Sequence, residues 1–337
     1  MKLSAFSVVD AFPAGTAAHR DRYAELLTLA ELSEHAGLET LWVAEHHFHN
    51  GGVCPAPPVL LAAAGARTRR LRLGVLVGVL PFHSAVGLAE EYALLDRVIG
   101  GRLNLGLGSG YIPLEFEGFG IDPQEKRERF DRSLAVVLEA WAGHEVRVDN
   151  GRSKPVKLNV LPRQQPHPPL WIAVQRREAI PYVARRGMNV ALVPYATLKE
   201  FAELRAEISE FRAALPLGIR ATVSVAVPLY TGESVREARS AFQAYLEGRL
   251  ATQSTFYTQK VHADARQASA DVIAESGFAL LDRPDRVEEG LRRLSEAGVD
   301  EVLGIFDFGG LAPELVRRSV EETAHLSVFA AEGRKPS

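Results

Sequence analysis

The stretch Leu71–Leu80, with the sequence LRLGVLVGVL, decides the fold. A run that is apolar nearly throughout indicates a strand buried on both faces, which is typical of parallel sheets covered by helices. Helical patterns on either side, about Pro57–Thr68 and Ala85–Ile99, supply such covers. The stretch therefore predicts the centre of a repeating strand–helix unit in an α/β protein.

The same alternation of strand and helix continues along the chain. The other β-rich runs are Leu3–Val9, Thr40–Glu45, Arg102–Gly108, Leu170–Val174, Asn189–Pro194, Thr222–Tyr230 and Glu301–Phe306. A helical pattern at Asp21–His35, which Gly37 ends, opens the series of connections. Parallel strands with right-handed crossovers follow from this order. Eight such units favour a (β/α)8 TIM barrel, with a doubly wound open sheet as the alternative. No linker divides the chain, so we expect residues 1–337 to form a single domain.

Residues 250–281 interrupt this rhythm after the seventh strand. The segment is polar, weakly periodic and longer than most connections in compact domains. Barrel active sites lie at the C-terminal ends of the strands, where the following loops gather. The segment is therefore predicted to be an active-site lid, with disorder as the alternative. A second polar stretch, 143–159, predicts a surface hairpin.

Composition excludes several classes of function. The formal net charge is −3 and the sequence pI is about 6.4, which argues against a nucleic-acid surface or a basic membrane anchor. The single cysteine, Cys54, excludes an internal disulfide framework and fits a reducing compartment. We interpret Cys54 as an inert thiol, with a nucleophile as the alternative. No signal peptide or apolar run of about 18 residues is evident, so we expect a soluble cytoplasmic protein with no membrane or nucleic-acid partner.

The second strand runs into the segment Trp42–Phe48, WVAEHHF, which carries the first candidate chemistry. Strand alternation places His46 on the same face as Trp42 and Ala44, and Glu45 and His47 on the other. Only one of the adjacent histidines can then point into the barrel mouth. A histidine there can titrate near neutrality and move a proton. A hydrogen-bonded pair of structural histidines is the alternative.

A metal centre is also to be weighed, because His47-x-His49 is a common ligand spacing on barrel strands. Metal-dependent barrels draw further ligands from other strand ends. The fourth, fifth and sixth strand ends supply no His or Lys ligand, and only Asp307 on the last strand fits. We therefore predict no metal.

Three other strand ends suit an aromatic ligand or its phosphate. The third ends in Val79–Phe82, an apolar wall of the kind that stacks on an aromatic cofactor. The fourth ends in Gly106–Tyr111 with alternating glycines, which let a ligand approach the backbone. The spacing resembles a dinucleotide fingerprint, but no helix is predicted directly after it and no acidic residue is suitably placed. The fifth ends in Gln175–Arg177 where a helix begins, which predicts a phosphate site or, alternatively, two solvated arginines.

Four segments together resemble the bacterial-luciferase-like family of flavin oxidoreductases. They are Leu41–Phe48, Leu73–Pro81, Ala89–Asp96 and Gly101–Tyr111, in matching order and spacing. The resemblance implies a two-component monooxygenase that uses reduced FMN (FMNH2) from a separate flavin reductase. In that family O2 adds to the flavin C4a to give a (hydro)peroxide. The peroxide then oxidises a medium-sized organic substrate by hydroxylation or Baeyer–Villiger insertion.

The resemblance also assigns expected roles to residues. His46 matches the family's active-site histidine, thought to stabilise the peroxide or act as a general base, and Glu45 and His47 flank it as further catalytic candidates. Leu76–Val77 falls where the family often has a non-proline cis peptide under the flavin ring. The small residues of Ala62–Ala66 suit close helix contact, in a region through which family members commonly dimerise, so a homodimer is expected. The candidate cofactor contacts are Leu76, Val77, Asn104, Gly108, Ser109, Tyr111, Gln175, Arg176 and Arg177.

The sequence departs from the luciferases at the phosphate end. Ser109 stands where they carry an arginine, and Gln175–Glu178 replaces a serine-rich segment. We expect Arg176 or Arg177 to take over part of the phosphate contact, and we do not expect light emission. Two alternatives remain on the same fold, a deazaflavin (F420)-dependent hydride-transfer enzyme and a non-catalytic flavin-binding subunit. Glu45–His47 argues against the second, because a degenerate subunit has little need of it. The sequence does not identify the substrate.

Overall fold

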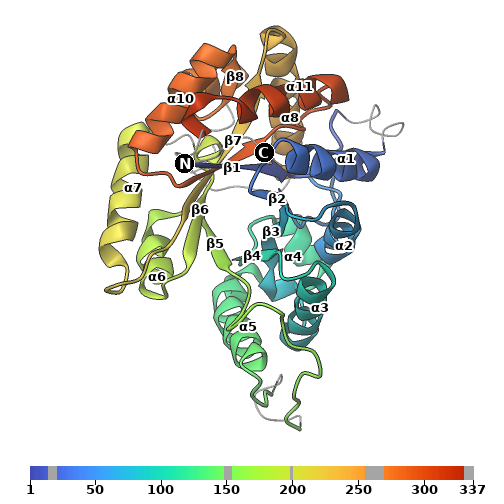
Figure 1. Ribbon diagram of the computed structural model, residues 1–337. Coiled ribbons are helices and arrows are strands. Elements are labelled where there is room, and N and C mark those ends of the chain that lie inside the picture. The colour runs from blue at the N-terminus through green and yellow to red at the C-terminus, as the bar shows by residue number, and fades with distance from the viewer. Residues whose placement is uncertain (14–20, 148–153, 198–199, 255–268, 330–337) are drawn as a thin grey trace.

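A computed structural model shows the helices arranged around a ring of strands (Figure 1). It describes residues 1–13, 21–147, 154–197, 200–254 and 269–329. The ring runs in the order β6-β5-β4-β3-β2-β1-β9-β7, and a pairing between β6 and β7 closes it. Its strands are β1 (Lys2–Ser7), β2 (Thr40–Val43), β3 (Arg72–Val79), β4 (Leu103–Gly108), β5 (Leu170–Val174), β6 (Asn189–Leu192), β7 (Val223–Thr231) and β9 (Glu301–Ile305).

The closed ring confirms the predicted (β/α)8 barrel. All the strand pairs are parallel, and β7 pairs with both β6 and β9, so the open sheet considered as the alternative is wrong. Every residue of β2, β4 and β7 is buried. Side chains from the barrel interior cover one face of each strand and the helices cover the other, which explains the continuous apolar runs in the sequence.

The helices begin and end where the sequence supplies suitable residues. Asp21 caps the first helix by accepting the backbone N–H groups of Tyr23 and Ala24 at 3.1 and 3.0 Å. Gly37 follows that helix with a φ of 74°, the left-handed conformation expected of a terminating glycine. The helices of the barrel are α1 (Arg22–His35), α2 (Pro57–Arg67), α3 (Ala85–Val98), α4 (Pro113–Gly118), α5 (Lys126–Trp141), α6 (Ile180–Arg185), α7 (Phe201–Ala214), α8 (Val235–Ser254), α10 (Pro284–Glu296) and α11 (Pro313–Ala324).

The predicted insertion at 250–281 is more ordered at its two ends than its polarity suggests. Helix α8 extends into this segment as far as Ser254, and a short helix, α9 (Ala270–Ser276), follows later. A ninth strand, β8 (Leu280–Asp282), pairs with the end of β7. The middle of the segment, 255–268, lies outside the described residues, so the lid stays a prediction.

The lower part of the barrel is filled by large and polar side chains. The indole rings of Trp42 and Trp171 meet edge to face with centroids 4.9 Å apart. Below them the Glu301 carboxylate accepts hydrogen bonds from Ser4 Oγ at 2.5 Å and Ser224 Oγ at 2.6 Å. These layers plug the N-terminal end of the barrel, so the C-terminal end is left for a ligand.

The polar stretch 143–159 folds back on itself, as the sequence predicts. Val146 and Val156 exchange two backbone hydrogen bonds, each of 2.9 Å. The expected hairpin is therefore supported at its base, and its tip, 148–153, lies outside the described residues.

Candidate active site

A cavity of about 650 Å3 lies at the C-terminal ends of the barrel strands. This volume falls within the range of about 300–1,000 Å3 typical of small-molecule sites. The first part of its wall is apolar and comes from residues at or just beyond the strand ends, including Phe6, Val8, Ala44, Leu76, Val77, Val79, Ile172, Val174 and Val193. Of the apolar wall predicted at Val79–Phe82, Val79 alone is among the lining residues, and the third strand contributes Leu76 and Val77 in addition.

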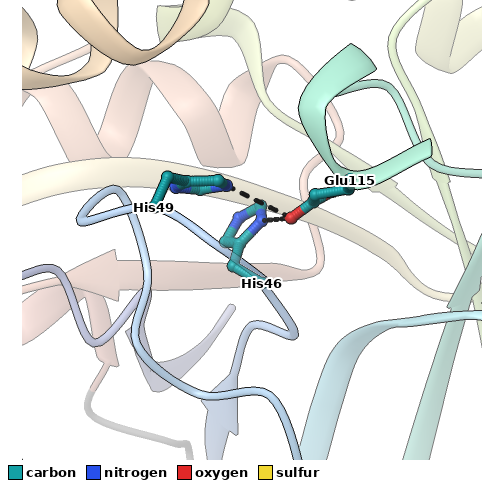
Figure 2. A group of neighbouring side chains, drawn as sticks. All are labelled: His46, His49 and Glu115. Atoms are coloured by element: carbon teal, nitrogen blue, oxygen red, sulfur yellow. Dashed lines mark hydrogen bonds and ion pairs between the residues drawn. The ribbon is translucent and has the colours of Figure 1, made fainter. Parts of the chain in front are cut away.

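The buried carboxylate of Glu115 on α4 contacts both histidines of this cavity. Glu115 Oε1 lies 2.9 Å from His46 Nδ1 and 3.2 Å from His49 Nε2, as Figure 2 shows. The same oxygen accepts the backbone N–H of His47 at 3.0 Å. His46 and His49 both line the cavity. The α4 helix thus fixes the orientation of two imidazole rings that the chain supplies after β2.

The charge of Glu115 determines how His46 is protonated. Burial alone would raise the pKa of Glu115, but hydrogen bonds from His46 and His49 outweigh it and hold the pKa at about 2. The carboxylate is therefore ionised near neutral pH and can only accept hydrogen bonds. His46 must then carry its proton on Nδ1, which leaves Nε2 as the free ring nitrogen when the imidazole is neutral.

A second buried carboxylate, Glu45, holds a separate pair of histidines. Glu45 Oε1 lies 3.0 Å from His47 Nε2 and 2.7 Å from His83 Nε2. Glu45 Oε2 accepts the backbone N–H of Val79, the last residue of β3, at 3.1 Å. Burial opposes ionisation, yet these hydrogen bonds lower the pKa of Glu45 and raise that of His83 above its ordinary value. Glu45 therefore ties the segment after β2 to the end of β3.

The two adjacent histidines point in opposite directions, as strand alternation predicts. His46 lines the cavity. The His47 ring instead packs among aromatic side chains, 4.8 Å from Phe119 and 6.0 Å from Phe82 between ring centroids. Glu45 also reaches the cavity wall, although its polar contacts are made with the outer histidines. Of the three predicted catalytic candidates, the geometry thus places only the His46 ring in the cavity with a nitrogen left to react.

The peptide bond between Leu76 and Val77 is cis, at the position that the family resemblance implies. Both residues line the cavity. A side chain at Gly106 would lie 2.6 Å from Leu76 Cδ1, and one at Gly108 would lie 2.4 Å from Val77 Cγ2. The glycines of β4 are therefore required by the close approach of β3, and the predicted approach of a ligand explains them only in part.

The segment after β4 departs from the sequence-based expectation. A helix does begin soon after the glycine-rich strand end, at Pro113, although none was predicted there. Proline suits the first position of a helix, because its missing N–H would have no partner there. This helix carries the acidic residue Glu115, which the sequence analysis missed. Its six residues are too few for a periodic pattern, and Glu115 lies 69 positions from His46 in the sequence.

Positive charge collects on another wall of the cavity. Arg176, at the end of β5, and Lys126, the first residue of α5, both line it, together with the predicted contacts Ser109 and Gln175. Burial and the nearby positive charge of Arg176 both lower the pKa of Lys126. Lys126 Nζ donates to the carbonyl oxygen of Gly110 at 3.3 Å. Two neighbouring cations with polar groups beside them form a suitable place for an anion.

Two predicted cofactor contacts, Asn104 and Arg177, are not among the residues that line the cavity, and their role stays a prediction. Asn104 is buried low in β4, where its side chain is hydrogen-bonded to Arg72 and Thr40. Arg177 points to solvent and pairs with Glu210 at 2.7 Å. The predicted arginine pair therefore splits, and Arg176 alone lines the cavity. Among the others, Leu76, Val77, Gly108, Ser109, Tyr111 and Gln175 all line it.

A cluster of tyrosines and one arginine forms a further part of the wall. Arg249 on α8 lies over the rings of Tyr195 and Tyr245, with its guanidinium carbon 5.5 and 5.7 Å from their centroids. The two tyrosine hydroxyls lie 3.3 Å apart. Tyr111 joins the cluster and its ring meets that of His46 edge to face, with centroids 6.2 Å apart. Sequence reasoning missed Arg249, which directly precedes the predicted lid and belongs to none of the strand ends searched for site residues.

His46, His49 and Glu115 also form the one group, among the described residues, whose side chains could hold a metal ion. Their ligand atoms lie within 4.8 Å of one another. The sequence analysis considered a different pair, His47 and His49, and the structure separates those two rings between different carboxylates. Three hydrogen bonds to Glu115 Oε1 connect the same groups, and the absence of a metal stays a prediction.

The single cysteine takes no part in this chemistry. Cys54 is fully buried. Burial, with a smaller contribution from the charge of Glu45, raises the pKa of its thiol to about 12. A thiol in such surroundings is a poor nucleophile, which agrees with the interpretation made from the sequence.

A family model described as luciferase-like monooxygenase matches residues 1–301. The chain belongs to this family. The match runs from the first strand to the last and includes all the residues of the cavity described above. The expected family resemblance is thereby confirmed.

Individual relatives point the same way. A monooxygenase named RslO1 from Streptomyces bottropensis has a solved structure with a TM-score of 0.84, 27% identity, and coverage of 97% of this chain and 99% of that one. The FMN-bound oxygenating constituent of 3,6-diketocamphane monooxygenase from Pseudomonas putida has a TM-score of 0.79 and 17% identity, and covers 97% of this chain and 98% of that one. At that identity the second likeness shows the fold alone.

Curated sequences match over shorter stretches. The oxygenase component of flavin-dependent trigonelline monooxygenase from Acinetobacter baylyi is 28% identical over 175 residues, 51% of this chain and 49% of the relative. An F420-dependent glucose-6-phosphate dehydrogenase from Beutenbergia cavernae is 32% identical over 171 residues, 48% of this chain and 50% of the relative. The chain spans about half the length of the curated relatives it matches. Separately, none of the helices described here is both long and apolar enough to cross a membrane.

Proposed function

We propose that this protein is the oxygenase of a two-component monooxygenase, which uses FMNH2 from a separate reductase and O2 to oxidise an organic molecule. One observation carries the proposal: the free ring nitrogen of His46 lies in a flavin-sized cavity whose other wall is cationic. Membership of the luciferase-like monooxygenase family supports it. Hydroxylation and Baeyer–Villiger insertion remain equally compatible with these residues.

The residues of the cavity fit an FMN molecule. Leu76, Val77 and the other apolar residues would cover the flat ring system, because stacking and burial supply most of the binding free energy of such a ligand. Ser109, Gln175, Arg176 and Lys126 would bind the phosphate. When bound and reduced, the flavin would supply the electrons that activate O2. The protein supplies orientation, shielding from water and a proton-handling group.

His46 is that proton-handling group. Glu115 holds the imidazole by Nδ1, so Nε2 is the atom that would accept or return a proton at the reacting centre. An ionised partner also stabilises the imidazolium that forms when the proton is taken up. His49 shares the same carboxylate oxygen and restricts how far Glu115 can turn.

The proposal includes association into a homodimer through the faces of α2 and α3. Val59 on α2, and Leu94 and Val98 on α3, are large apolar side chains exposed by 68%, 56% and 64%. Apolar side chains that gather on neighbouring helices favour contact with another surface. Sedimentation velocity would test this, and a monomer at micromolar concentration would contradict it.

Stopped-flow mixing tests the main proposal. Protein saturated with photoreduced FMN is mixed with air-saturated buffer, and flavin reoxidation is followed at 450 nm. We expect reoxidation to be much slower than that of free FMNH2, because a shielded site limits the side reaction that releases hydrogen peroxide. Reoxidation at the rate of free flavin would overturn the proposal. Reduced F420 serves as the alternative cofactor, and hydride transfer from it without oxygen consumption would favour the F420-dependent class instead.

The cationic wall is tested by flavin titration. Arg176→Met should weaken FMN binding by about tenfold, the effect of losing one charged contact of about 1.4 kcal/mol. Arg177→Met is the matched control, because Arg177 pairs with Glu210 outside the cavity and its loss should leave FMN affinity unchanged. An equal effect of the two changes, or no effect of Arg176→Met, would contradict the placement of the phosphate.

A further inference from the structure

Arg249 places a positive charge in the cavity on a different element from the cations of the proposed phosphate site. It belongs to α8, whereas Lys126 belongs to α5 and Arg176 follows β5. Among the described residues no carboxylate forms an ion pair with Arg249, while Arg127, another cation of the lining, lies 3.5 Å from Asp131. Within the part of the chain that the structure describes, the groups found to interact with the Arg249 guanidinium are the tyrosines Tyr111, Tyr195 and Tyr245.

The phenols around Arg249 do not neutralise its charge. Burial raises the pKa of Tyr111 and raises that of Tyr245 well above its ordinary value. Both hydroxyls are therefore un-ionised near neutral pH. Ring faces and neutral oxygens stabilise a guanidinium, but a charge withdrawn from water is stabilised far more by an anion. Since no carboxylate of the described residues pairs with Arg249, the anion that would stabilise it best is one brought by a ligand.

The cluster also adjoins the proposed reacting centre. Tyr111 is hydrogen-bonded to Arg249 on one side, and its ring lies against that of His46 on the other, with centroids 6.2 Å apart. A molecule held at Arg249 would therefore extend past Tyr111 toward His46. Tyr195 and Tyr245 line the same part of the cavity, so an aromatic body held at Arg249 would lie beside their rings.

We propose that Arg249, together with Tyr195 and Tyr245, binds the carboxylate of an aromatic acid and so orients this substrate class with its ring toward His46. The planar guanidinium matches a carboxylate by two parallel hydrogen bonds, which an amide cannot reproduce. This inference rests on the proposed function, since it takes the cationic wall near Lys126 as the place of the flavin phosphate. It makes Arg249 a specificity-determining residue.

Calorimetric titration with a matched pair of probes tests it. The probes are 2-naphthoate and 2-naphthamide, which have nearly the same shape and differ in charge, and excess FMN is kept in the cell and the syringe. We expect the wild-type protein to bind the acid at least about tenfold more tightly than the amide. Arg249→Gln should abolish this preference, and Arg249→Lys should keep part of it. The exposed Arg177→Gln is the control and should behave as wild type.

Three results would overturn the inference. They are failure of 2-naphthoate to bind the wild-type protein, an unchanged acid preference in Arg249→Gln, and a fall in FMN affinity in Arg249→Gln that equals the fall in acid affinity. The last would assign Arg249 to the cofactor. Circular dichroism melting of each variant ensures that the comparison is made between folded proteins. If FMN fails to bind the wild-type protein, the proposed function fails, and the same titration without FMN still measures the contribution of Arg249.

Discussion

Glu115 and Glu45 make nearly the same kinds of contact, but they lie in different parts of the molecule. Each is a buried carboxylate that contacts two imidazole rings and one backbone N–H. The two histidines of Glu115, His46 and His49, line the cavity. Figure 2 shows how both rings meet the carboxylate. Those of Glu45, His47 and His83, lie outside the lining residues. Because only the histidines of Glu115 line the cavity, we expect a chemical role for that group and an architectural role for the Glu45 group.

The difference can be traced to the elements that carry the two carboxylates. Glu45 follows β2 and bonds to the end of β3, so it links two neighbouring strands of the barrel. Glu115 stands on α4, a short helix laid over the mouth after β4. A group that links strands supports the fold, while a group on a loop element is free to serve the site that the loops enclose.

Removal of His46 should lower turnover more than any other change, so it is the strongest test of the difference between the Glu115 and Glu45 groups. We expect His46→Gln to lower the rate of substrate oxidation by about 10² to 10⁴-fold, the usual contribution of a positioned acid–base group. FMN affinity should change little, because His46 is not part of the cationic wall. The matched control is His83→Gln in the Glu45 network, for which we expect a change of only a few-fold. An equal loss of activity in the two variants would contradict the different roles of the Glu115 and Glu45 groups.

Glu115→Gln should have the next largest effect. The amide cannot stabilise an imidazolium as a carboxylate does, and it can donate to His46 and so favour the wrong tautomer. We expect turnover to fall by about ten- to a hundredfold, with less change in the KM of the organic substrate than in kcat. Steady-state kinetics across pH 6–9 would measure this. A wild-type profile with a normal kcat would show that Glu115 does not orient His46.

The same variant changes how stability depends on pH. Because folding lowers the pKa of Glu115 from 4.5 to about 2, the ionised group stabilises the folded state above pH 4.5. That contribution is lost as the pH falls from 4.5 through about 2. Urea unfolding of wild type and Glu115→Gln should therefore show a free-energy difference that shrinks over this window. A difference that stays constant would mean that the carboxylate is not specifically stabilised by its histidines.

Glu45→Gln should affect turnover least and stability most directly. Loss of the charge weakens three buried hydrogen bonds, and we expect a destabilisation of about 2 kcal/mol near neutral pH. Turnover of the remaining folded protein should stay within a few-fold of wild type. Chemical denaturation and kinetics on the same preparation measure both quantities. A large kinetic loss without a loss of stability would place Glu45 among the reacting groups.

The sequence predicts the barrel well because its signals are local. Continuous apolar runs indicate the strands, and Asp21 and Gly37 mark the two ends of α1 within the sequence itself. Alternation along Trp42–Phe48 also predicts correctly that only one of the two adjacent histidines faces the cavity, and the structure shows that it is His46. The alternation of side chains between two faces, which has a period of two residues, continues for a few residues beyond the end of the strand.

The parts that could not be predicted depend on contacts between distant segments. Glu115 has no sequence neighbour that reveals its role, because its partners lie in the turn after β2. Arg176 and Arg177 are adjacent and chemically identical, and only the direction of each side chain separates the cavity from Glu210. The glycines of β4 suggested space for a ligand, while the structure shows that Leu76 and Val77 fill much of it.

The stretch of chain between β4 and α5 has a consequence for how such an enzyme can diversify. It carries Glu115, which sets the proton position on His46, and it ends at Lys126, which contributes to the cationic wall. A single recombination event that exchanged this stretch would alter proton handling and anion recognition together, while every barrel strand kept its sequence. The barrel strands would then stay constant, while exchange of this one loop changed the reaction that the protein catalyses.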